Sequence, residues 1–259
     1  MTPRLDAAQT GEGPPIVLLH GLSATKRYVV HRSNVLPRSG YRIVAYDARG
    51  HGESAPPDDP DAYDYSDLSA DLGAVMDEFE LERAALAGVS MGAHTALRFA
   101  LEHPDRVSAL VVITPGYPGE PADEGRWDDM ADALEAGGIE GFLESWGAQD
   151  VAARFRDAAL ETARQRLSLH RELPAVARAL RIVPRSEAFA GLRALREIDV
   201  PALVVGSRDD ADPMHPIAIA ESYVEELPHG RLLVEGEGKA PLAWQGARLS
   251  RAIVDFLRA

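Results

Sequence analysis

The sequence contains no cysteine. This absence excludes disulfide bonds, thiolate metal sites and any cysteine nucleophile. Lysine is nearly absent as well: of the 27 basic residues, 25 are arginine and only Lys26 and Lys239 are lysine. Compositional drift in such a chain favours arginine, so a lysine at a particular position suggests that it is kept for its own properties.

Long apolar runs and an excess of basic charge are also missing. No apolar run approaches the roughly 18 residues of a membrane span, and the first ten residues, MTPRLDAAQT, have no apolar core of signal-peptide length. With 41 acidic residues and a formal charge of −14, the chain is a poor candidate for binding nucleic acid or anionic membranes. These features predict a soluble cytoplasmic protein.

Short apolar runs alternate with amphipathic stretches along the chain. In 259 residues, this alternation predicts one large α/β domain with a mostly parallel sheet flanked by helices. The expected strands are 16–19, 41–47, 84–89, 107–114, 201–207 and 231–235, and helices are expected at 65–80 and 247–257.

The pattern changes between the fourth and fifth of these strands, where no strand-like run occurs. Helical stretches are expected at 128–137, 138–147, 152–170 and 175–181. We therefore predict a helical lid, residues 115–197, inserted into a core made of 1–114 and 198–259. Trp127 and Trp146 in this lid are candidate substrate contacts.

The strongest local motif is G-x-S-x-G, residues 88–92, in the segment AGVSMGAH. A strand precedes it and a helix follows, which is the context of a nucleophile elbow with Ser90 as the nucleophile. Acyl transfer needs two backbone N–H groups directed at the developing oxyanion. We expect these from Met91 and from Leu22, which follows Gly21 in the loop after an earlier strand; Gly21 is expected to border the substrate.

Four motifs in order, HGL, YDARGHGES, GVSMG and PALVVGSRDDADP, resemble the α/β-hydrolase superfamily. They are most similar to its lid-bearing branch of esterases, lactonases, C–C bond hydrolases and haloperoxidase-like enzymes. The resemblance implies a Ser–acid–His triad at the carboxyl edge of the sheet, with no cofactor or metal. It places the acid at Asp209, with Asp210 and Asp212 as neighbouring alternatives, and gives His51 a possible substrate contact. Because only a short segment precedes the first expected core strand, we expect the family's usual leading hairpin to be trimmed.

The family's catalytic histidine usually follows the last strand in the motif G-x-G-H-x-P. The corresponding segment here is GEGKAP, residues 236–241, so Lys239 stands where the histidine is expected. No histidine follows His229, which precedes the last expected strand and therefore belongs at the opposite edge of the sheet.

Three interpretations follow. In the leading one, the protein hydrolyses a small carboxylic ester or lactone with an atypical Ser90–Asp209–Lys239 site. A lysine base must be neutral, and a neighbouring aspartate opposes this, so such a site works best at high pH. In the second, His215 supplies the base from the loop that carries the acid. In the third, the site performs lyase- or transferase-type chemistry or binds a ligand, with Lys239 as a cation.

Overall fold

The computed structural model describes the whole chain except residues 1, 117–123, 148–149, 209–211 and 213. Its described strands form one seven-stranded sheet in the order β1-β3-β2-β4-β5-β6-β7, and only β1 runs antiparallel to its neighbour. The strands are β1 (Ala7–Thr10), β2 (Pro15–Leu19), β3 (Arg42–Tyr46), β4 (Ala84–Val89), β5 (Val107–Ile113), β6 (Ala202–Val205) and β7 (Gly230–Leu233).

All six strands expected from the apolar runs are present, and β1 is an additional edge strand. Its sequence, AAQT, is short and mostly exposed, so it carries no apolar pattern that would predict a strand. It pairs with β3, with Ala7 opposite Tyr46 and Thr10 opposite Ile43. Backbone pairing with β3 forms this short strand, and the expectation that the leading hairpin is trimmed stays a prediction.

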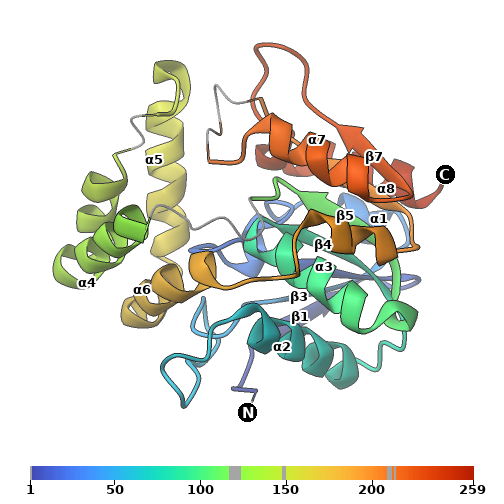
Figure 1. Cartoon of the computed structure of the whole chain (residues 1–259), viewed down its shortest axis with the longest axis horizontal. Helices are drawn as coiled ribbons and strands as arrows, with labels where there is room; N and C mark the ends of the chain where they lie inside the picture. The colour runs from blue at the N-terminus through green and yellow to red at the C-terminus, as the bar shows by residue number, and fades with distance from the viewer. Residues whose placement is uncertain (1, 117–123, 148–149, 209–211, 213) are drawn as a thin grey trace.

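Helices cover both faces of the sheet, as Figure 1 shows. Alternate side chains of β2 point to opposite faces: Val17 and Leu19 belong to one core cluster, and Ile16 and Leu18 to the other. The first cluster packs against α2 (Tyr65–Glu78), α3 (Met91–Glu102) and α7 (Ile217–Glu226), and the second against α1 (Val35–Arg38) and α8 (Gly246–Leu257). Short 3-10 helices occupy Lys26–Tyr28, Pro104–Arg106, Val183–Arg185, Leu192–Glu197 and Leu242–Trp244.

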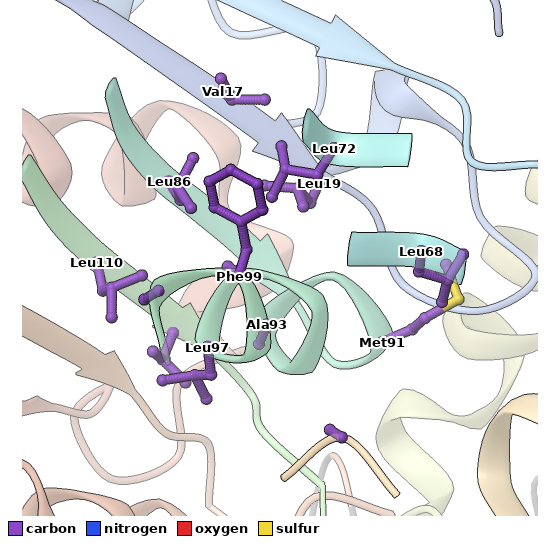
Figure 2. Close-up of a cluster of buried hydrophobic side chains, with 14 of the residues drawn as sticks. Val17, Leu19, Leu68, Leu72, Leu86, Met91, Ala93, Leu97, Phe99 and Leu110 are labelled. Atoms are coloured by element: carbon purple, nitrogen blue, oxygen red, sulfur yellow. The ribbon is translucent and has the colours of Figure 1, made fainter. Parts of the chain in front are cut away.

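The helix α3 is the centre of the first core cluster. Figure 2 shows Phe99 extending from α3 toward Leu86 of β4 and Leu19 of β2, with Leu97 near Leu110 of β5. Leu97 and Leu110 are completely buried. This packing holds α3 against the strands on which the site described below is built.

Three further helices lie between β5 and β6 in the chain: α4 (Glu124–Trp146), α5 (Ala153–Leu167) and α6 (Leu173–Ile182). These insertion helices have their own apolar cluster, which includes Leu134, Leu167 and Val176, and Figure 1 shows them grouped beside the sheet. Gly138 kinks α4 with φ 61° and ψ −148°, at the point where the sequence predicts one helix to end and another to begin. No helix in the described residues is both long enough and apolar enough to cross a membrane.

The burial of Leu97 predicts a large loss of stability when its side chain is shortened. Replacing it in Leu97→Ala removes apolar contacts and leaves a cavity, so we expect the free energy of unfolding to fall by about 2–5 kcal/mol in urea denaturation. The matched control is Leu232→Ala, because Leu232 is 38% exposed, and it should cost less than about 1 kcal/mol. Equal losses in both variants would contradict the packing described.

Candidate active site

The chain reverses sharply at Ser90, between the end of β4 and the start of α3. Ser90 has φ 48° and ψ −109°, a backbone conformation that non-glycine residues rarely adopt. Two glycines allow this turn. A Cβ atom on Gly88 would lie 2.2 Å from the carbonyl oxygen of Gly92, and one on Gly92 would lie 2.4 Å from that of Leu19. The elbow predicted from G-x-S-x-G is therefore present, and it lifts the Ser90 hydroxyl above the carboxyl end of β4.

A histidine lies beside that hydroxyl. His215 Nε2 is 2.9 Å from Ser90 Oγ, and His215 Nδ1 is 3.0 Å from both carboxylate oxygens of Asp212. In a neutral imidazole, Nδ1–H donates to the carboxylate and Nε2 accepts from the serine hydroxyl. Asp212, His215 and Ser90 thus form a continuous hydrogen-bonded chain that can move a proton away from the serine.

The charge of Asp212 controls the protonation of His215. Burial lowers the pKa of His215, but the charge and hydrogen bond of Asp212 outweigh burial and a smaller opposing effect of Arg166, so the pKa is raised above its ordinary value. Burial alone would raise the pKa of Asp212, yet His215 and Arg166 together hold it below its usual range. The pair therefore favours an ionised carboxylate and a histidine that holds a proton readily.

Leu22 and Met91, whose backbone amides are expected to bind an oxyanion, border the same space as the serine. Leu22 and Met91 both line the cavity described next, and within the described part of the chain neither amide N–H donates to a protein acceptor. Gly21 brings its loop close to the elbow, since a Cβ there would lie 3.3 Å from the carbonyl oxygen of Val89. The oxyanion-binding role expected of these two amides stays a prediction.

Ser90 and His215 open into a cavity of about 600 Å³. One wall comes from the core loops that carry Gly21 and Ser90, and the opposite wall comes from the insertion helices. That second wall is mostly apolar and includes Trp127, Met130, Phe142, Trp146, Ala159, Ala163 and Leu180. The predicted contacts Trp127 and Trp146 therefore both face the cavity, whose size suits a small organic molecule.

Comparison with known proteins bears on this arrangement. The sequence profile of the alpha/beta hydrolase fold matches residues 14–247. The chain belongs to the α/β-hydrolase family. The family model and a relative matched over nearly its full length are of hydrolases, so the chain is an enzyme of hydrolase type.

Individual relatives extend over nearly the full length. A 2-hydroxy-6-oxononadienedioate/2-hydroxy-6-oxononatrienedioate hydrolase from Burkholderia vietnamiensis is 30% identical, with 98% of this chain and 91% of the relative aligned. An enol-lactonase from Burkholderia xenovorans superposes with a TM-score of 0.81 at 22% identity over 98% of this chain and 96% of that one. A thermophilic esterase from Thermogutta terrifontis gives a TM-score of 0.80 at 25% identity over 98% and 93%. With other curated relatives, the match spans about half of their length.

Lys239, expected at the base position of this α/β-hydrolase, lies elsewhere. Its side chain is exposed and does not line the cavity, while its backbone N–H donates to Gly236 at 3.1 Å. The glycine and proline spacing around it predicted the loop but not the direction of the side chain, and an ammonium group gains hydration by pointing to water. The described structure thus places His215, not Lys239, beside Ser90. Asp209 lies outside the described residues, and Asp212 occupies the carboxylate position.

His51 also differs from its expected role. It is 1% exposed and does not border the cavity. Its Nδ1 lies 3.0 Å from the carbonyl oxygen of Arg49, and its Nε2 accepts a hydrogen bond from the Ser23 N–H at 3.4 Å. Because both ring nitrogens serve loop backbone, His51 fixes the loop that follows Gly21 and does not reach a substrate in this structure.

The sequence analysis did not anticipate several polar residues of the cavity wall, and Arg166 is one of them. Arg166 of α5 faces the cavity, together with Ala159 and Ala163 of the same helix. Positions 159, 163 and 166 lie on one face of a helix. In the sequence, the only indication that Arg166 would line the cavity was that it shares this face with two alanines. Among the described residues, no group of three or more histidine, aspartate or glutamate side chains could hold a metal ion.

The Ser90–His215 contact predicts how the serine reacts with a fluorophosphonate probe. We expect the probe to label Ser90 in the native protein and not in Ser90→Ala. His215→Ala should slow labelling by about 100-fold or more, because general-base catalysis contributes roughly that much. Lys239→Ala, the matched control, should label at the native rate. Slow labelling of Lys239→Ala with normal labelling of His215→Ala would reverse the assignment.

Proposed function

We propose that this enzyme is a serine hydrolase of small carboxylic esters or lactones, with Ser90 as nucleophile, His215 as general base and Asp212 as the acid that orients it. The observation that carries the proposal is the 2.9 Å contact between Ser90 Oγ and His215 Nε2, which continues to Asp212. A hydroxyl is a weak nucleophile unless an adjacent base accepts its proton, and these atoms supply that base.

The steps follow from the positions of these groups. His215 Nε2 takes the hydroxyl proton as Ser90 Oγ attacks the ester carbonyl carbon, and the Leu22 and Met91 N–H groups bind the resulting oxyanion. When the carbonyl re-forms, the C–O bond to the alcohol breaks, and the imidazolium returns its proton to the alcohol oxygen. Water then attacks the acyl-enzyme with His215 again as base, releasing the acid and restoring Ser90. A lactone gives a single hydroxy acid by the same steps.

The cavity supports substrates of modest size with an apolar portion. Its volume of about 600 Å³ and its tryptophan-rich wall suit a short acyl chain or a small ring. The insertion helices form that wall, so residues 115–197 act as a lid in this proposal. Among proteins of similar structure, one is described as an enol-lactonase and another as an esterase, which agrees with ester or lactone chemistry.

The other two interpretations of Lys239 have less support. A base must reach the serine proton, and a cation that steers a reaction must face the cavity, whereas the side chain of Lys239 is exposed and outside the cavity wall. An atypical Ser–Asp–Lys site and a non-hydrolytic use of Lys239 would both require the loop after β7 to take another conformation.

The raised pKa of His215 predicts the pH dependence of ester hydrolysis. The imidazole must be neutral to accept the serine proton, so the rate should fall as the pH drops through a pKa that lies above the ordinary histidine value of 6.5. With 4-nitrophenyl butyrate between about pH 5 and pH 10, we expect a rise followed by a plateau, with Ser90→Ala as the blank. A Ser90-dependent rate that climbs without a plateau into the alkaline range would instead indicate a lysine base.

Removing the charge of Asp212 should lower both the plateau and the apparent pKa. In Asp212→Asn the amide no longer stabilises the imidazolium or fixes its tautomer, so we expect kcat to fall by about 100-fold or more. The apparent pKa should move downward, because the interaction that raises it is lost. Asp150→Asn is the matched control, since Asp150 also lines the cavity but pairs with Arg126. An unchanged pKa in Asp212→Asn would exclude Asp212 as the orienting acid.

A further inference from the structure

Four residues with formal charge line the described cavity: Arg126, Asp150, Arg166 and Asp212. Arg126 and Asp150 form an ion pair at 3.5 Å, and Asp212 is hydrogen-bonded to His215. Arg166 differs from the other three. In the part of the chain that the structure describes, its guanidinium has no ion-pair partner, and its buried Nε atom has no hydrogen-bond partner.

The position of Arg166 on α5 makes this unusual. The other residues of its face, Ala159 and Ala163, are buried. Arg164, two positions earlier, turns to the surface and pairs with Glu140 at 2.8 Å. A positive charge near the carboxyl end of a helix is favourable because it interacts with the negative end of the helix dipole. This effect accounts for an arginine in the last turn of α5. It does not account for the position of that arginine in the cavity wall.

Arg166 is partly buried, and a charge in such a place is costly when no described residue pairs with it. Burial lowers the pKa of Arg166, and the charges of Asp212 and Tyr28 act in the opposite direction. Arginine nevertheless stays protonated in proteins. The cavity wall therefore carries a fixed cation whose donors lack a partner among the described residues, and a group that enters the cavity can supply one.

We propose that Arg166 binds a carboxylate of the substrate, so that the enzyme prefers esters or lactones carrying a carboxylate away from the bond that is cleaved. This inference rests on the proposed hydrolase function and specifies its substrate. The planar N–H fork of a guanidinium matches a carboxylate, and one positive charge balances one negative charge. A phosphate dianion would leave excess negative charge in a cavity that already holds Asp212.

The test compares two esters that differ in the terminal group. Mono-4-nitrophenyl adipate presents a carboxylate at the end of its acyl chain, and 4-nitrophenyl heptanoate presents a methyl group on a chain of similar length. Shorter dicarboxylate monoesters are avoided, because their own carboxylate attacks the ester. The quantity measured is the ratio of kcat/KM for the adipate ester to kcat/KM for the heptanoate ester, in the native enzyme and in Arg166→Gln.

We expect the native enzyme to favour the adipate ester and Arg166→Gln to lower the ratio by about 10- to 100-fold, the effect of a lost charge-assisted hydrogen bond. The loss should appear mainly in KM. Arg166→Lys should recover part of the preference, because it keeps the charge without the fork. Arg164→Gln is the matched control and should leave the ratio unchanged, since Arg164 is outside the cavity wall.

A binding experiment separates failure of this inference from failure of the proposed function. It measures the affinity of hexanoate for the Ser90→Ala protein by calorimetry. Weaker binding in Ser90→Ala/Arg166→Gln by about 10-fold or more supports the carboxylate site even if neither ester is hydrolysed. An equal loss of rate for both esters in Arg166→Gln, with unchanged hexanoate binding, would reduce Arg166 to a structural role and overturn the proposal. A native enzyme that prefers the heptanoate ester and does not bind hexanoate would overturn it too.

Discussion

The close approach of α3 to β4 is the constraint on which the rest of the site depends. The chain must leave the strand, expose Ser90 and enter a helix without an intervening loop, and it does so only because Gly88 and Gly92 leave room for neighbouring backbone. The strain at Ser90 is offset by the packing of α3 against the sheet, shown in Figure 2. The direction of the serine hydroxyl is consequently fixed before any substrate binds, and the other groups of the site are positioned around it.

Features that depend on neighbouring residues in the chain could be predicted from the sequence. Buried parallel strands require continuous apolar runs, and the elbow requires small residues at fixed spacing, so both leave local patterns. The break of α4 at Gly138 was readable for the same reason. The strand β1 was not, because edge pairing uses backbone groups that every residue has. Leu22 and Met91 were chosen by their offset from the motifs, and both residues line the cavity, while the role of their amides stays a prediction.

The groups that complete the site depend on which loops meet in space, and here the sequence was a weaker guide. The motif after β7 predicted the loop of Lys239 correctly, but no local pattern records whether a long side chain turns inward or to water. The scarcity of lysine did not indicate a role for Lys239, because the two lysines of the chain lie in different surroundings. Lys26 is partly buried and pairs with Asp6 and with Asp47, whereas Lys239 is exposed. Arg166 gains its significance only when α5 packs over the cavity, since a charge on a helix face is otherwise ordinary.

The positions of Asp212 and His215 on one loop have a consequence for how the proposed site can change. In a triad drawn from separate loops, acid and base are held apart by the sheet and can be altered independently. Here they are three residues apart and follow the same strand, so one insertion or deletion would displace both. The segment after β7 then supplies neither acid nor base in the proposed site, and its contribution is structural: Glu235 accepts a hydrogen bond from the Arg208 N–H of the loop that leads to Asp212. A short loop is thus the smallest portion of chain whose transfer to a related scaffold would carry the complete acid–base pair.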